Sequence, residues 1–220
     1  MRFIYGPIPS SQTFDPKEEG WTPLGGTDVD ASRFAVIAGL LSVPFIVPAV
    51  WVLLSSRSEI RGFLLGNPLY FVAFLILLVA LIPVHEFIHA LAYLKGLRSP
   101  RLMMGAWINR GMFYVIYDAP MPRHRVLLMS VMPFMLLSVL PVVCLLLLEL
   151  QQEWMVLGWF LILIHASLCT GDFLVWWRLG FCVPHGAWIH NNGWTTYWTT
   201  EYDPKDPHNN NLPLLHLIFR

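Results

Sequence analysis

Charge of either sign is scarce in this sequence. Charged residues make up 13% of the 220 positions, and 14 Lys and Arg residues balance 14 Asp and Glu residues. The lack of a basic excess argues against a nucleic-acid partner. Hydrophobic residues reach 56%, above the roughly 45–50% typical of soluble domains. The composition therefore predicts an integral membrane protein.

Cysteine is also rare. Cys144, Cys169 and Cys182 show no CxxC spacing, so neither a disulfide framework nor a thiolate metal site is indicated. Residues 1–33 are polar and lack the basic start and short apolar core of a signal peptide. We expect them to form a polar N-terminal tail. No internal repeat suggests a transporter built from two related halves.

Long hydrophobic runs dominate the rest of the chain. Each of four runs is long enough to cross about 30 Å of hydrocarbon at about 1.5 Å per helical residue. The runs are residues 34–54, 70–94, 126–148 and 154–177. The sequence therefore predicts an all-α integral membrane protein with about four transmembrane helices. A last apolar piece, residues 212–219, is too short to span and is expected to lie on a surface.

Basic residues predict the orientation of the chain. They concentrate in the N-terminal tail, in the loop of residues 95–125 and after the fourth run, whereas the opposite side holds Arg57 and Arg61. Because Lys and Arg favour the cytoplasmic side, we expect both termini to be cytoplasmic. Within the loop, residues 102–108 and 112–117 are rich in strand-forming residues and flank a turn. They predict a short cytoplasmic β-hairpin between the second and third helices.

The second run contains the sequence HEFIH. His85 and His89 are four positions apart, so on a helix both imidazoles face one metal ion. Glu86 is turned by about 100° from His85 and is suited to a catalytic water. A zinc ion lowers the pKa of its water ligand, and the carboxylate transfers the proton to a leaving amine. Ionisable residues inside a span are costly, so metal coordination explains this group better than a hydrogen-bonded polar helix face.

A two-histidine site needs a third protein ligand, and the fourth run offers two candidates. Asp172 lies at a depth similar to that of the HEFIH residues, and Gly171 beside it permits close backbone approach. His165 lies about two turns deeper, which suits contact with a ligand better than contact with the metal. Asp172 is the preferred ligand. The alternatives are His165 as the ligand, or Asp172 as an interfacial carboxylate paired with Arg178.

HEFIH in one span followed by an aspartate in a later span resembles the site-2 protease class of intramembrane zinc metalloproteases. The pattern is more similar still to a domain-of-unknown-function family of membrane zincins that pair HExxH with Gly-Asp. The resemblance covers roughly residues 70–180. It implies one Zn²⁺ per chain bound by His85, His89 and Asp172, with Glu86 as the general base. It also implies a peptide or membrane-protein substrate, and strand 112–117 is a candidate binding edge, although a simple surface hairpin lying on the membrane is favoured at least as strongly.

These features divide the chain into three parts. They are a polar tail (1–33), a membrane metallopeptidase-like domain (34–180) and a Trp-rich cytoplasmic or interfacial segment (181–220). Aromatic residues in the last part are typical of the headgroup level of a bilayer, so His185 and His190 are not expected to bind metal.

The sequence predicts a zinc-dependent intramembrane or membrane-proximal peptidase. Two alternatives remain, a non-catalytic protein with a structural metal clamp and a small transporter. The clamp predicts a closed coordination sphere that includes His165. The sequence does not indicate an oligomeric state.

Overall fold

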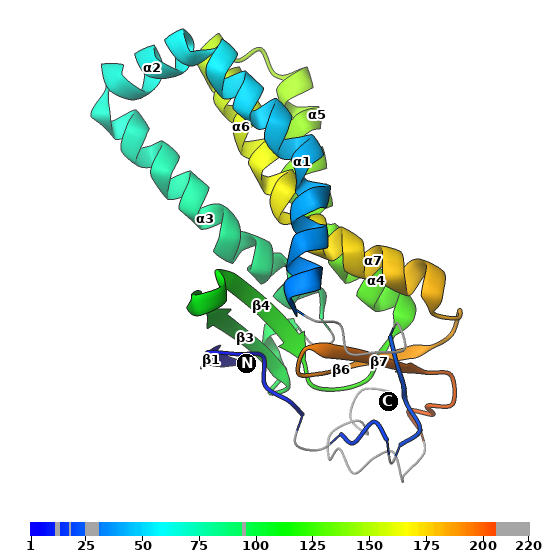
Figure 1. Cartoon of the computed structure of the whole chain (residues 1–220). Coiled ribbons are helices and arrows are strands. Elements are labelled where there is room, and N and C mark those ends of the chain that lie inside the picture. The colour runs from blue at the N-terminus through cyan, green and yellow to red at the C-terminus, as the bar shows by residue number, and fades with distance from the viewer. Residues whose placement is uncertain (12–13, 18, 25–30, 94–95, 206–220) are drawn as a thin grey trace.

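The computed structural model describes residues 1–11, 14–17, 19–24, 31–93 and 96–205. Within these ranges the chain forms seven α-helices and seven β-strands (Figure 1). The helices are α1 (Ala31–Ser55), α2 (Arg57–Gly66), α3 (Pro68–Ala92), α4 (Arg123–Phe134), α5 (Leu140–Leu147), α6 (Gln152–Leu168) and α7 (Thr170–Cys182). The strands are β1 (Arg2–Tyr5), β2 (Thr22–Pro23), β3 (Leu102–Trp107), β4 (Met112–Tyr117), β5 (Met121–Pro122), β6 (Trp188–Asn192) and β7 (Thr195–Thr199).

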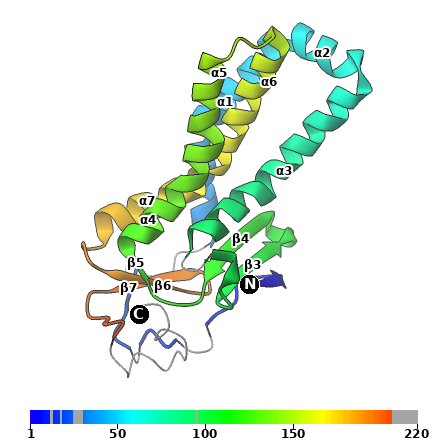
Figure 2. The ribbon, with the colours of Figure 1, turned by 180° about the vertical axis from the view of Figure 1, so that it is seen from behind.

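The long helices form one end of the molecule. α1, α5 and α6 lie side by side, and α3 slopes away from them after α2 (Figures 1 and 2). In the described part of the chain, three helical segments are long and apolar enough to cross a membrane: Val36–Ser55, Pro68–Ala92 and Arg123–Leu147. A fourth exists if α6 and α7, bent by 46°, form one span. The predicted number of about four is therefore the upper limit.

Local sequence explains where α3 begins. The Asn67 side chain accepts a hydrogen bond from the Leu69 backbone N–H at 3.0 Å, and Pro68 occupies the first turn. Both are favourable at a helix start, where backbone N–H groups lack helical partners. The helix then runs unbroken through Pro83 to the HEFIH residues.

The third span changes its winding in the middle. α4 and α5 are joined without a break by a π-helical segment, Met135–Val139. Pro133 precedes this segment and Pro141 follows it. Proline cannot donate the regular helical hydrogen bond, and single π turns are a common way to accommodate such disruption. The wider turn places Ser138 inside the helical layer, where it is buried.

Two β-sheets pack at the end of the helices where α3 finishes (Figure 2). The first has the order β1-β3-β4, with β1 parallel to β3 and β3 antiparallel to β4. The second has the order β2-β7-β6-β5, and its neighbours are all antiparallel. β4 is an edge strand of the first sheet. The N-terminal segment therefore contributes an outer strand to each sheet.

The predicted all-α class with a single hairpin is wrong, because the described residues contain two sheets. The predicted hairpin is present as β3 and β4, although Ile108 belongs to the turn. The hairpin of β6 and β7 was missed although Asn192-Gly193 is a turn signal, and Gly193 adopts a left-handed φ of 59°. β1, β2 and β5 have two to four residues, too few for an alternating pattern.

One hydrophobic core joins the sheets to the helices. It lies between the end of α3, the start of α4, the end of α7 and the inner faces of the sheets. Its buried residues are Leu24, Ala90, Tyr93, Leu102, Tyr117, Ala119, Met121, Val126, Leu179, Val183, Ala187 and Ile189. This core fixes the ends of α3 and α7 relative to each other. The predicted surface piece, residues 212–219, lies outside the described residues.

Candidate metal centre

The HEFIH residues meet the first turn of α7. His85 and His89 lie one turn apart on α3, and both are 7% exposed. Asp172 lies in the first turn of α7, where the positive end of the helix dipole favours a carboxylate. The predicted fourth helix is broken at Cys169, so Asp172 occupies a helix start rather than a helix middle.

The three predicted ligand side chains converge. His85 Nε2 lies 3.1 Å from Asp172 Oδ2, and His89 Nε2 lies 3.2 Å from Asp172 Oδ1. The two Nε2 atoms lie 3.1 Å from each other. Tetrahedral zinc with bonds of about 2.1 Å separates its ligand atoms by about 3.4 Å. The three distances join two imidazole nitrogens and both carboxylate oxygens, and each is close to the ligand spacing that a zinc ion requires.

Hydrogen bonding around the cluster leaves room for a cation. The His89 Nδ1 atom lies 3.1 Å from the Met129 carbonyl oxygen, which only accepts, so Nδ1 carries the proton and neutral His89 directs an Nε2 lone pair inward. The buried Asp172 Oδ2 atom has no hydrogen-bond partner in the described part of the chain. His85 Nε2 is close to it but not at a hydrogen-bonding angle. Converging lone pairs with an unbonded carboxylate oxygen fit a divalent ion.

His165 lies behind His85 and does not join the three ligand atoms. Its Nε2 atom is 3.2 Å from His85 Nδ1, on the other side of that ring from Asp172. His165 Nδ1 lies 2.8 Å from the Ser138 Oγ atom, and the His165 side chain is fully buried. This chain of contacts holds the orientation of the His85 ring, as partners of metal-binding histidines commonly do.

A second group of potential donors shares His85. It consists of His85, His165 and Cys169, with the Cys169 Sγ atom 3.9 Å from His85 Nδ1 and 3.8 Å from His165 Nε2. This group contains no carboxylate, whereas the first group contains Asp172. Cys169, for which the sequence indicates neither a disulfide nor a thiolate metal site, is buried at the α6–α7 bend.

A pocket of about 220 Å³ opens beside the three ligand side chains. Glu86, His89 and Asp172 line this metal pocket together with Tyr114 and Val115 of β4. Glu86 is part-exposed and points to the same space as the ligands. The pocket therefore brings the Glu86 carboxylate next to His89 and Asp172 of the converging cluster.

Tyr93 links the end of α3 to β4. Its hydroxyl donates to the Val115 carbonyl oxygen at 3.0 Å. Burial raises the pKa of Tyr93 above its ordinary value, so the hydroxyl stays protonated and this hydrogen bond persists over a wide pH range. Tyr93 was not predicted to take part in the site, because it lies inside the apolar run of residues 70–94 and no local pattern indicates its contact with β4.

Arg178 and His190 both have partners away from the cluster. Asp172 does not pair with Arg178, whose guanidinium donates to the Leu24 carbonyl oxygen at 3.1 Å. His190 is buried in the sheet, with its ring 4.0 Å from that of Phe14 and its Nε2 atom 3.5 Å from Asp118 Oδ1. His190 therefore does not sit at an open interface. No local pattern indicates its contact with Asp118, which lies 72 positions earlier.

Comparison with known proteins gives a family. The model of a protein family described as "Putative zincin peptidase" matches residues 78–187, which is half of the chain. Searches of the curated proteins and of the solved structures return no match. The matched region begins before HEFIH and ends after α7, so it includes every residue of the converging cluster.

Proposed function

Because the chain belongs to this family of zincin peptidases, we propose that it is a zinc-dependent peptidase that hydrolyses a peptide bond inside or beside the membrane. His85, His89 and Asp172 hold one zinc ion per chain. The observation that carries the proposal is the enclosed Asp172 Oδ2 atom, which lies without a hydrogen bond beside two imidazole Nε2 atoms. A carboxylate in that position is strongly disfavoured without a cation.

Glu86 transfers the protons of the reaction. When bound, a zinc ion lowers the pKa of a water ligand and polarises the peptide carbonyl. Glu86 lines the metal pocket together with His89 and Asp172, so its carboxylate can accept a proton there and return it to the leaving amine. The Met129 carbonyl and His165 orient the two histidine rings from behind.

The substrate is a peptide or a segment of a membrane protein in extended form. β4 is an edge strand, and its residues Tyr114 and Val115 line the metal pocket together with Glu86. Extended peptides commonly bind by adding to such an edge. The apolar helices beside the pocket and the resemblance to site-2 proteases support cleavage close to the bilayer. By the distribution of basic residues, the sheets and both termini face the cytoplasm.

A structural clamp explains the arrangement less well. A clamp that includes His165 needs all four side chains around one point, but His165 contacts the far nitrogen of the His85 ring. Glu86 also lines an open pocket rather than packing against the ligands. Both features favour a site that admits a substrate.

The test compares purified Glu86→Gln and His85→Ala proteins with wild type. We expect Glu86→Gln to retain zinc and lose hydrolysis, and His85→Ala to lose both. His124→Ala is the matched control, because His124 is exposed at the start of α4. Zinc is measured by elemental analysis, and substrates are sought as membrane proteins that accumulate uncut in cells carrying Glu86→Gln. Stoichiometric zinc in His85→Ala would contradict the ligand assignment, and hydrolysis by Glu86→Gln would contradict the role of Glu86.

A further inference from the structure

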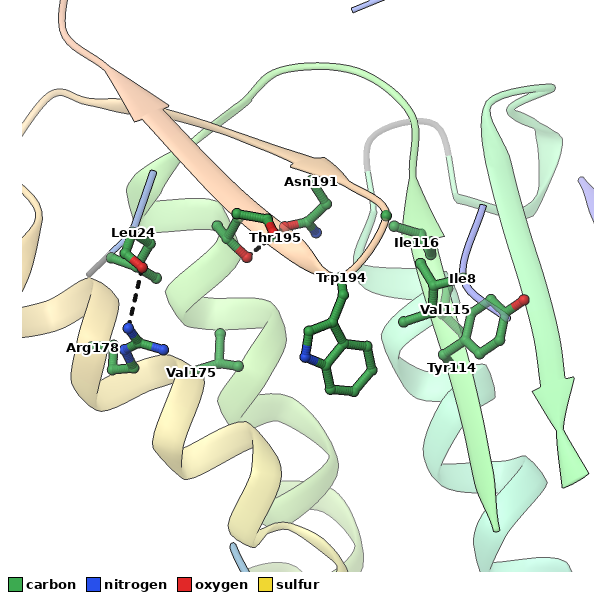
Figure 3. A pocket seen from close by; sticks show the side chains of 12 residues that line it. Ile8, Leu24, Tyr114, Val115, Ile116, Val175, Arg178, Asn191, Trp194 and Thr195 are labelled. Carbon is green, nitrogen blue, oxygen red and sulfur yellow. Dashed lines mark hydrogen bonds between the residues drawn. The ribbon is translucent and has the colours of Figure 1, made fainter. Parts of the chain in front are cut away.

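A second pocket adjoins the metal pocket. It has a volume of about 180 Å³ and is lined by Arg178 and Trp194 among other residues (Figure 3). We call it the Arg178 pocket. Several residues line both pockets, namely Tyr114, Val115, Val175, Asn191 and Thr196. The two pockets are therefore adjacent compartments of one groove along β4.

The walls of the Arg178 pocket are largely apolar. Figure 3 shows the Trp194 indole between Val175 of α7 and Val115 of β4. Leu24 and Ile116 add aliphatic surface. Such walls accommodate an aliphatic stem and lower the local dielectric, which strengthens charge interactions inside the pocket.

The Tyr114 wall is held in place by two features. The ring lies directly over Gly105 of β3, where any Cβ atom would collide with it. The Tyr114 hydroxyl lies 3.2 Å from the carbonyl oxygens of Gly6 and Pro7 and donates to this pair. The pocket is thus largely formed before a ligand arrives.

Arg178 provides the charge at one end. Its guanidinium has five N–H donors, and one of them donates to the Leu24 carbonyl oxygen at 3.1 Å. Among the carboxylates of the described ranges, none forms an ion pair with Arg178. A carboxylate entering the pocket would form charge-assisted hydrogen bonds with a planar donor group suited to it.

The distance from the metal ligands sets the position of that carboxylate. Arg178 follows Asp172 by six residues on α7, which corresponds to about 9 Å of helix rise. An extended peptide advances about 3.3 Å per residue. The Arg178 pocket therefore lies about three residues along a peptide whose scissile bond is at the metal.

We infer that the Arg178 pocket is a specificity subsite that recognises a carboxylate, on an acidic side chain or at a peptide C-terminus, about three residues from the cleaved bond. This inference rests on the proposed peptidase function for its reaction, but binding at Arg178 can be measured without hydrolysis. The apolar walls contact the methylene groups of the ligand, and the Arg178 guanidinium donates hydrogen bonds to its carboxylate.

The experiment uses the full chain with the additional substitution Glu86→Gln, in phosphatidylcholine nanodiscs, and a set of extended peptides. A single glutamate is moved along an otherwise neutral sequence, with a C-terminal amide or a free carboxylate in separate arms. We expect replacement of the recognised glutamate by glutamine to weaken binding about ten-fold or more. The amide arm separates a side-chain carboxylate from a C-terminal one.

Substitutions at Arg178 identify the residue responsible. Arg178→Gln should abolish the preference for glutamate, and Arg178→Glu should transfer the preference to a lysine at the same peptide position. Arg61→Gln is the control, because Arg61 is exposed on α2 at the far end of the helices. Zinc content and thermal unfolding confirm that each variant is folded.

The outcomes separate this inference from the proposed function. Hydrolysis by wild type with no preference for glutamate overturns the subsite and leaves the peptidase proposal intact. Binding of glutamate peptides that depends on Arg178, without hydrolysis by wild type, supports the subsite and counts against the peptidase. If the protein binds phosphatidylglycerol vesicles more tightly than every acidic peptide, and this binding depends on Arg178, the subsite is overturned. The pocket would then recognise a lipid phosphate.

Discussion

The molecule contains two pairings of histidine with aspartate, one in the helices and one in the sheets. His85 and His89 meet Asp172 where α3 and α7 come together, whereas His190 of β6 meets Asp118 just after β4. Asp172 and Asp118 have the same side-chain exposure, 21%. Burial of the carboxylate therefore does not distinguish a metal site from a structural pair.

The number and direction of the donor atoms do distinguish them. In the helices, two imidazole nitrogens lie 3.1 Å apart and each lies 3.1–3.2 Å from one oxygen of Asp172, and a pocket with Glu86 opens beside them. In the sheet, one imidazole lies 3.5 Å from one carboxylate oxygen and packs under the Phe14 ring. Convergence and access support the proposed metal site in the helices, whereas the His190–Asp118 contact joins β6 to the segment after β4.

The largest expected effect is a difference in bound zinc between variants of the two aspartates. Asp172→Asn should reduce bound zinc from one ion per chain to nearly none, because a neutral amide cannot replace an anionic ligand. Asp118→Asn should keep the full complement of zinc. Elemental analysis of both purified proteins, with hydrolysis of any identified substrate, measures the difference. Equal zinc content in the two variants would remove the basis for assigning the metal to α3 and α7.

A smaller effect is expected for the support behind His85. Ser138→Ala removes the oxygen that lies 2.8 Å from His165 Nδ1, and the ring that orients His85 loses a partner. Loss of such a partner typically weakens metal binding by about 10- to 100-fold. Zinc affinity is measured by competition with a chelator.

Ser167→Ala is the control for that measurement. The Ser167 hydroxyl donates to the Ile164 carbonyl oxygen within its own helix and should not affect zinc. If the two serine variants bind zinc with equal affinity, the contacts of His165 and Ser138 do not position His85. The His85 ring would then have no more support from neighbouring side chains than His190 has in the sheet.

The helical cluster was more predictable than the sheets for physical reasons. Helical periodicity places residues four apart on one face, so His85 and His89 were identified from their spacing alone. Hydrophobic length gave the spans, and the depth of Asp172 made it the preferred partner. The bend at Cys169 and the π turn that positions Ser138 depend on packing between helices, and no local pattern predicted them.

The sheets depend on contacts between distant parts of the chain. β1 pairs with β3 about 100 positions later, and β2 pairs with β7 about 175 positions later. Aromatic residues of β6 and β7 also satisfy the pattern of a membrane interface, which hid their strand character. His190 was for the same reason assigned to the bilayer surface rather than to the sheet.

The smallest expected effect concerns pH. Contact with His190 holds the pKa of Asp118 below its ordinary value of 3.8, while burial opposes this shift. A lowered pKa in the folded state means that the charged carboxylate stabilises the fold above pH 3.8, and that this contribution is lost as the pH falls through the lowered pKa. Because the contact is long and part-exposed, we expect less than about 1 kcal/mol.

The thermal midpoint of wild type should therefore exceed that of Asp118→Asn near neutral pH, and the gap should close as the pH falls below the ordinary pKa of 3.8 and through the lowered pKa of Asp118. Both proteins are measured after zinc removal, so that protonation of metal ligands contributes equally. Glu149→Gln, at an exposed position, controls for loss of a carboxylate in general. A difference in thermal midpoint that stays constant with pH would mean that the charge on Asp118 does not stabilise the sheet. Packing would then hold β6 against the segment after β4.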